Sequence, residues 1–307
     1  MKRVLRIGSR GSRLAIWQSE FVKGLITREF PEIQIEISII RTTGDKIGDL
    51  QLSEIGGKAI FVKEIEEALL SRQIDVAVHS LKDLPAILPL ELKIGAVTER
   101  HDPRDALVSR LTHSFRELPK GARVGTGSIR RQAQLLHFRP DLQIIPIRGN
   151  VDTRVKKVRN DGVDGVVLAL AGLERLGLQD EVTDIFSFET MVPAPGQGII
   201  AVECRESDEE TVRMLIQINH EASSIAAFAE RSFLEKLGGS CHVPAGCYAE
   251  VKEDSINIIG LVASPDGKKY IREDIIGSLG LSTALGRELA DRIIQKGGEG
   301  ILRNLPA

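Results

Sequence analysis

The sequence predicts a mixed α/β protein in which two similar α/β lobes are followed by a small α+β domain. Over roughly the first 200 residues, strand-like and helix-like segments alternate, which is typical of βαβ units and a largely parallel sheet. A strand, a loop rich in glycine and serine, and a helix follow one another from residue 6 and again from residue 123. Beyond about Asn219 the alternation gives way to a helix, three strands and a closing helix. A chain of 307 residues is long enough for two or three domains.

Each element is assigned from its hydrophobic period and its boundary residues. Apolar and β-branched runs predict strands over residues 4–8, 33–40, 74–79, 94–98, 123–125, 144–147 and 165–170. Helices are expected over residues 12–30, 58–72, 128–139, 151–160 and 171–176. Ser12 and Ser128 open two of them, and serine accepts a backbone N–H bond at a helix N-cap. In the C-terminal part we expect a helix over 225–237, strands over 243–251, 255–262 and 269–276, and an amphipathic helix over 283–296.

Two segments look like crossings between the lobes, residues 99–103 and residues 191–198. The strand-like residues 199–203 would then return the chain to the first lobe. We therefore expect a discontinuous domain 1 (1–99 with 196–218), a domain 2 (100–195) and a domain 3 (219–307). Two crossings between two lobes make a hinged cleft, which is a natural place for a ligand. The two helix N-termini that follow the glycine- and serine-rich loops would favour an anionic ligand.

Composition narrows the class of protein. No apolar run approaches the ~18–20 residues that span a bilayer, and the N-terminus lacks the apolar core of a secretory signal. We therefore expect a cytoplasmic protein. The three cysteines, Cys204, Cys241 and Cys247, form no Cys-x-x-Cys pair, so we predict neither a disulfide framework nor a metal site.

The net charge of −2 hides a strongly basic segment. Residues 121–160 carry nine basic and two acidic side chains, and most of the basic ones are arginines. Arginine pairs bidentately with carboxylate or phosphate, although a solvated helix face is the common meaning of a charge run. Because the chain has only one Trp and two Tyr, base stacking with a nucleic acid is not favoured.

Cys241 stands in a segment of glycine, serine and proline, which predicts a loop. A thiol placed there is a candidate nucleophile or covalent attachment point, and the alternative is an ordinary partly buried thiol. Asp83 and Lys82 follow the apolar strand at 74–79, at the end where ligands bind in α/β sheets. Asp83 is the best candidate for a general acid/base or for a carboxylate that stabilises a developing cation, and the alternative is a surface turn.

Lys58 and Phe61 follow a glycine pair at residues 56–57. The segment lacks the spacing of a nucleotide phosphate loop, so we expect these two side chains over the ligand cleft. The alternative is a plain helix start with Phe61 in the core.

Taken together, eight segments strongly resemble the porphobilinogen deaminase (hydroxymethylbilane synthase) family. They cover residues 10–18, 56–64, 79–85, 100–106, 125–132, 148–154, 195–198 and the Cys241 loop, in family order. The resemblance implies a transferase of tetrapyrrole and haem biosynthesis, with two lobes like type II periplasmic binding proteins and a smaller third domain. Such an enzyme deaminates four porphobilinogen molecules and joins them head to tail into linear hydroxymethylbilane.

The resemblance also implies roles for individual residues. A dipyrromethane cofactor would be attached to Cys241 through a thioether, and Asp83 would bind pyrrole N–H groups and stabilise positive charge as ammonia leaves. Cofactor binding would involve Lys82, Asp83, Thr126, Ser128, Arg130 and Arg131. Substrate binding would involve Arg10, Ser12, Gln18, Lys58, Phe61, Arg148, Arg154, Arg175 and Gln197.

Two positions depart from the family pattern. Glu54 stands where lysine is frequent, and Ser240 precedes the cysteine where glycine is usual. The partner implied is the small molecule porphobilinogen, with no nucleic acid or membrane, and the expected state is a monomer. The alternative hypothesis is a two-lobed protein that binds a small anion without turnover.

Overall fold

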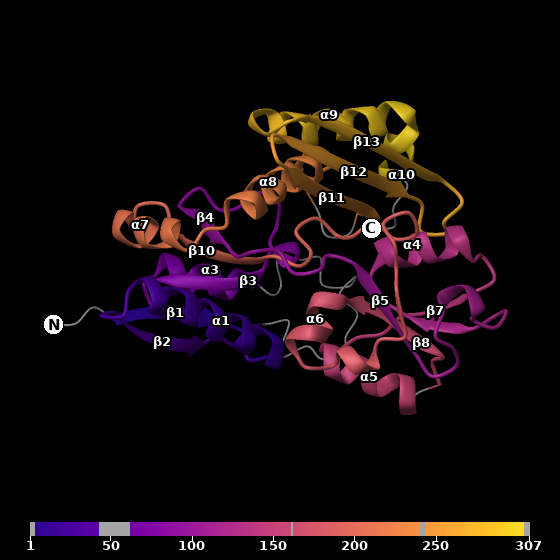
Figure 1. Ribbon diagram of the computed structural model, residues 1–307, viewed down its shortest axis with the longest axis horizontal. Helices are drawn as coiled ribbons and strands as arrows, with labels where there is room; N and C mark the ends of the chain where they lie inside the picture. Colours follow the sequence, from indigo (N-terminus) through magenta and orange to yellow (C-terminus); the bar gives the residue numbers. More distant parts are fainter. Residues whose placement is uncertain (1–3, 43–61, 161, 240–242, 304–307) are drawn as a thin grey trace. The chain divides into compact units, whose positions relative to one another are not determined.

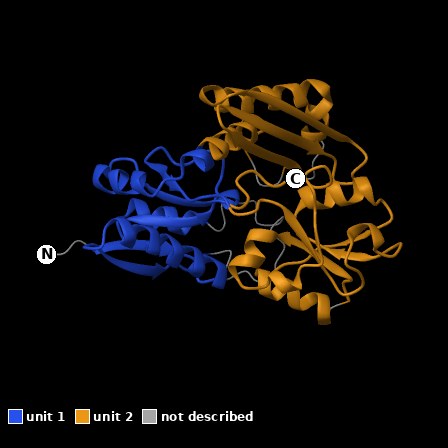
Figure 2. Cartoon of the chain, viewed as in Figure 1, with its two compact units in different colours: residues 1–100, 199–224 blue, residues 101–198, 225–307 orange. Residues whose placement is uncertain are grey.

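The computed structural model describes residues 4–42, 62–160, 162–239 and 243–303. The chain divides into two compact units, Met1–Arg100 with Ile199–Ser224 and His101–Gly198 with Ile225–Ala307 (Figure 2). Lys58, Phe61 and Cys241 lie outside the described residues, as do Glu54 and Ser240. Each unit is considered by itself.

The first unit is built on one five-stranded sheet (Figure 1). Its strands, in spatial order, are β2 (Gln34–Ile39), β1 (Val4–Ser9), β3 (Val76–Ser80), β10 (Ile200–Arg205) and β4 (Leu92–Val97). Its helices are α1 (Arg13–Glu29), α3 (Lys63–Leu70) and α7 (Glu209–Gln217). β1 is parallel to β2 and β3, whereas β10 is antiparallel to β3 and β4. The predicted return of the chain to the first lobe is therefore confirmed.

The second unit contains a sheet of the same design. Its strands, in spatial order, are β7 (Gln143–Ile145), β6 (Arg123–Gly125), β8 (Gly165–Ala169), β5 (Asp105–Ser109) and β9 (Asp184–Ile185). Its helices are α4 (Ile129–Phe138), α5 (Val151–Asn160) and α6 (Leu170–Arg175). β6 is parallel to β7 and β8, and β5 is antiparallel to β8 and β9. The two sheets match strand for strand, which confirms the two similar lobes.

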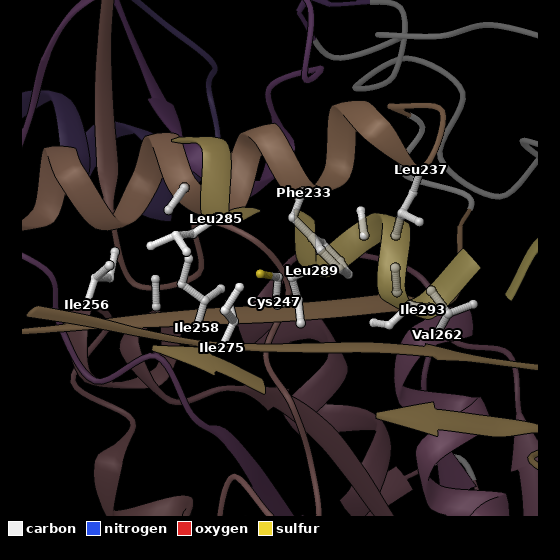
Figure 3. Close-up of a cluster of buried hydrophobic side chains, with 14 of the residues drawn as sticks. Phe233, Leu237, Cys247, Ile256, Ile258, Val262, Ile275, Leu285, Leu289 and Ile293 are labelled. Atoms are coloured by element: carbon white, nitrogen blue, oxygen red, sulfur yellow. The ribbon is translucent and has the colours of Figure 1, made fainter. Parts of the chain in front are cut away.

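The second unit also holds a three-stranded antiparallel sheet of β11 (Ala245–Lys252), β12 (Ser255–Ala263) and β13 (Tyr270–Ser278). One face is covered by α8 (Glu221–Lys236) and α9 (Ser282–Ile293). Figure 3 shows the apolar core between them, in which Phe233, Cys247 and Leu289 are fully buried. This is the small α+β domain that the sequence predicts.

The other face of this three-stranded sheet packs on α4, since Leu261 and Ala263 join Ala133 in one buried cluster. At the turn before β13, the Nδ1 atom of His137 lies 3.0 Å from the carbonyl oxygen of Gly267. The His137 ring also stacks on Tyr270, with 3.9 Å between the ring centroids. α4 is therefore part of both sheets' packing in this unit.

Several boundaries differ from those predicted. The strand expected over 144–147 ends at Ile145, because Pro146 has no N–H to donate to a ladder. The closing α-helix ends at Ile293 and continues as a π-helical turn over Ile294–Gly298, in which Gly297, with a φ of 104°, breaks the helical path before α10 (Glu299–Arg303). Within the described part of the expected helix 58–72, α3 covers only Lys63–Leu70. β5, β9 and α7 were not predicted.

Among the helices that the structure describes, none combines the length and the apolar character needed to cross a membrane.

Candidate functional site

The first candidate feature is the N-terminus of α1. Ser12 is the N-cap residue, and its hydroxyl accepts a hydrogen bond from the Ala15 N–H at 3.2 Å. The first turn carries no acidic residue, so the partial positive charge of the helix N-terminus is not neutralised there. Arg10 lies just before the cap and is half-buried. A carboxylate is the natural ligand of such a terminus.

The N-terminus of α4 repeats this arrangement in the second lobe. Ser128 caps the helix and accepts from the Arg131 N–H at 3.4 Å, and no acidic residue lies in the first turn. The Thr126 hydroxyl accepts from the Ser128 N–H at 3.1 Å, which holds the loop before the cap. The two caps follow β1 and β6, which occupy equivalent places in the two sheets.

The first turn of α4 carries two buried arginines on one buried carboxylate. Nη1 of Arg130 donates to Oδ2 of Asp105 at 2.8 Å, whereas Nε and Nη2 of Arg131 donate to Oδ1 at 3.0 and 2.7 Å. Nε2 of Gln197 donates to the same Oδ1 at 2.9 Å. Asp105 is fully buried, and although burial opposes its ionisation, the two guanidinium groups hold its pKa well below the usual range.

Asp105, the first residue of β5, was not predicted from the sequence as a site residue. The available signal was a lone carboxylate at the head of an apolar strand, in the half of the chain that is otherwise rich in arginine. Burial lowers the pKa of Arg130, whereas its ion pair with Asp105 acts to raise it.

In the first lobe, Asp83 lies past the carboxyl end of β3, as the sequence predicts. Leu81, which opens the short 3-10 turn Leu81–Asp83, and Leu84, which follows it, are each 1% exposed and anchor the turn. The Leu81 N–H donates to the carbonyl of Ile199 at 3.0 Å. Between these anchors Asp83 is exposed, so its carboxylate is accessible to a ligand.

The end of β3 is also tied to α1. Nε2 of Gln18, which is 3% exposed, donates to the Ser80 hydroxyl at 2.8 Å. Lys82 is half-buried beside Asp83. Gln18, Ser80, Lys82 and Asp83 therefore share one edge of the first sheet.

The remaining candidate arginines lie in the second unit. Nε of Arg154 donates to the Gly149 carbonyl at 2.7 Å, and Nη2 of Arg175 donates to the Gly198 carbonyl at 2.7 Å. Burial lowers the pKa of Arg175 to about 10, and the nearby Glu174 carboxylate opposes that shift. Arg148 is half-buried.

A second group of titratable side chains that was not predicted from the sequence consists of His79 on β3, Glu203 on β10 and Glu66 on α3. Nε2 of His79 lies 3.2 Å from Oε2 of Glu203, and both side chains are buried. Burial, followed by repulsion from the Glu203 carboxylate, raises the pKa of Glu66 on α3 to about 7. The signal in the sequence was a single glutamate within the apolar run of β10.

Two of the three cysteines are described, and both are fully buried. Burial raises the pKa of Cys204 to about 11, so its nucleophilic thiolate is scarce. Cys247 lies in the apolar core of the three-stranded sheet (Figure 3).

In class, the chain is an α/β protein whose two similar lobes each begin a helix without an acidic residue in its first turn, and in which Asp83 is exposed past the carboxyl end of β3. Two family models match it: "Porphobilinogen deaminase, dipyromethane cofactor binding domain" over residues 5–213, and "Porphobilinogen deaminase, C-terminal domain" over residues 224–295. The chain belongs to the porphobilinogen deaminase family.

Curated relatives agree over nearly the whole length. A porphobilinogen deaminase of Syntrophomonas wolfei is 48% identical over 300 residues, covering 98% of each chain. One of Pelobacter propionicus is 46% identical over 303 residues, covering 99% of this chain and 97% of the relative. Among solved structures, the methionine binding protein MetQ aligns with a TM-score of 0.47 at 13% identity, covering 72% of this chain and 91% of that chain.

Proposed function

We propose that this protein is a transferase that deaminates porphobilinogen and joins four molecules head to tail into linear hydroxymethylbilane. Its membership of the porphobilinogen deaminase family, over almost its whole length, carries this proposal. The product belongs to tetrapyrrole and haem biosynthesis. We further propose that the protein acts as a cytoplasmic monomer without a nucleic-acid partner.

The cofactor is dipyrromethane, in keeping with the family model that covers residues 5–213. The residues at the start of α4 fit its acid side chains, because Ser128 caps a helix N-terminus with no acidic residue in its first turn. We propose that Lys82, Asp83, Thr126, Ser128, Arg130 and Arg131 hold it. Bound in this way, a dipyrromethane would supply the free pyrrole end to which the first substrate unit is joined.

We propose Cys241 as the attachment point. The other two cysteines are fully buried, Cys204 on β10 of the first sheet and Cys247 on β11 of the C-terminal sheet. Neither offers the accessible thiolate that thioether formation requires. This supports Cys241 by elimination.

The substrate carries an acetate and a propionate on each pyrrole, so its binding needs cations and N–H donors. We propose the N-terminus of α1 with Arg10 and Ser12 as one subsite. The other side chains proposed to contact substrate are Gln18, Lys58, Phe61, Arg148, Arg154, Arg175 and Gln197.

Asp83 is proposed as the catalytic residue. Its exposed carboxylate, held by the anchored turn after β3, can accept pyrrole N–H bonds. A fixed negative charge at that place also stabilises the positive charge that develops on the pyrrole as ammonia departs. The proposed mechanism therefore requires the Asp83 carboxylate, with its negative charge, at this position.

The test is the intact mass of the denatured protein, measured for wild type and for Cys241→Ala. We expect excess mass equal to two pyrrole units in the wild type and none in Cys241→Ala. Cys247→Ala is the matched control and should keep the excess mass. Porphobilinogen should then be consumed with release of ammonia, and binding without either change would favour the two-lobed anion-binding protein instead.

A further inference from the structure

Arg130 and Arg131 are adjacent in sequence, yet Asp105 engages them differently. In Arg131 the carboxylate-binding edge formed by Nε and Nη2 is occupied, since both atoms donate to Oδ1 of Asp105. Its Nη1 donates to the Val167 carbonyl at 3.0 Å. All three nitrogens of this guanidinium group are thus bonded within the protein.

Arg130 uses a single nitrogen for its internal bonds. Its Nη1 donates to Oδ2 of Asp105 at 2.8 Å and to the Val192 carbonyl at 2.7 Å. No described residue accepts from its Nε or Nη2. These two atoms form the planar edge that binds a carboxylate bidentately.

The charge balance of this buried group also favours an additional carboxylate. One carboxylate and two guanidinium groups leave a net charge of +1 on this buried group, and both arginine side chains are about 5% exposed. An additional carboxylate would balance that charge and use the open edge of Arg130. The N-terminus of α4, in whose first turn Arg130 lies, favours the same ligand.

We propose that Asp105 is a positioning residue for the acid-binding start of α4: it fills the carboxylate-binding edge of Arg131 and thereby leaves that of Arg130 open for an acetate or propionate of the cofactor. The inference rests on the proposed function and adds a division of labour to it. Arg131 holds the Asp105 carboxylate in place, and Arg130 binds the ligand. Gln197 fixes Asp105 further, because its Nε2 donates both to Oδ1 of Asp105 and to the Pro103 carbonyl.

The test is Asp105→Asn in the full-length protein. Asparagine keeps the shape but places an N–H₂ group against a guanidinium and removes the charge that holds both arginines. We expect the fraction of protein carrying the cofactor mass to fall about tenfold, with KM for porphobilinogen raised in the loaded remainder and kcat less affected.

Asp75→Asn is the matched control. Asp75 also serves two arginines, accepting from Arg6 at 3.0 Å and from Arg205 at 3.4 Å, and all three residues belong to the first unit. It should lose thermal stability to a similar degree while keeping its cofactor. Equal loading of the two variants would overturn the inference.

If Asp105→Asn does not fold, Asp105→Glu decides. A carboxylate moved by one methylene keeps the charge but cannot serve both arginines at these distances, so loading should fall in a folded protein. Wild-type loading of Asp105→Glu would overturn the inference. A wild-type protein that neither carries nor gains cofactor mass from porphobilinogen would overturn the proposed function, and the inference with it.

Discussion

The imidazole of His79 and the carboxylate of Glu203 face each other across neighbouring antiparallel strands, 3.2 Å apart and almost completely shielded from water. One carboxylate oxygen of Glu203 is bonded to the ring, whereas the other, Oε1, has no partner among the described residues. Glu66 adds a second carboxylate, whose Oε1 is likewise buried without a partner there. The first lobe therefore holds two carboxylates that each bury one oxygen without a partner among the described residues.

Glu66→Gln should stabilise the protein at high pH. The pKa of Glu66 is raised from 4.5 to about 7, so ionisation favours the unfolded chain as pH rises from 4.5 through about 7. Because the side chain is only half-buried, we expect a gain of about 1 kcal/mol at pH 8 and none near pH 4.5. Urea unfolding at the two pH values measures the difference.

Glu67→Gln is the control for this prediction, since Glu67 is exposed on the same helix and 3.9 Å from Lys63. Its effect should be small and similar at both pH values. A Glu66→Gln effect that does not change with pH would rule out the buried carboxylate as its cause.

Gly267→Ala should weaken the packing of α4 on the C-terminal sheet. The glycine has a φ of +72°, and a Cβ there would clash with the backbone nitrogen of His137 and lie 2.7 Å from the Ala133 carbonyl oxygen. The matched control is Gly177→Ala, at a φ of +68° with nothing within 4 Å of the added carbon. The control should cost about 1 kcal/mol and Gly267→Ala a further 1–3 kcal/mol in thermal unfolding. Equal costs would contradict the close approach.

Asp83→Ala should abolish porphobilinogen turnover while leaving the fold intact. Since Asp83 is exposed, its removal should change the free energy of unfolding by no more than about 0.5 kcal/mol. Glu91→Ala, also exposed in the first unit, should keep turnover. Ammonia release and circular dichroism on the same samples provide the test, and near-normal activity of Asp83→Ala would remove it from the mechanism.

Ser128→Ala should affect both stability and ligand binding. Loss of the α4 N-cap should cost about 1 kcal/mol of unfolding free energy. It should also lower the fraction of protein that carries the cofactor mass, because the cap orients the helix N-terminus. Ser114→Ala is the control: Ser114 caps a short 3-10 turn by accepting from the Arg116 N–H at 3.3 Å, and this turn is bonded to Arg139 at the opposite end of α4 from Ser128. A loss of loading in both variants would indicate a general effect of stability.

Sequence signals that extend over a few residues predicted those site residues whose position depends on a helix start or a strand end. The caps Ser12 and Ser128 and the turn at Asp83 were found because a helix start or strand end is encoded within a few residues. Asp105 was missed because its partners Arg130 and Arg131 come 25 and 26 residues later. The His79–Glu203 contact spans 124 residues and is fixed only by the pairing of β3 with β10. Side-chain networks that cross strands depend on strand order, which the periodicity of one segment does not contain.

The strand order also has a consequence for how the protein is made. Among the described strands of the first sheet, β4 pairs only with β10, which is encoded about a hundred residues later. The second lobe has its five strands within one uninterrupted stretch, Asp105–Ile185. During synthesis from the N-terminus, the lobe that leaves the ribosome first therefore cannot complete its sheet until the lobe behind it has emerged. The usual order of domain folding is reversed, and the exposed edge of β3 is a segment for chaperones to protect in the interval.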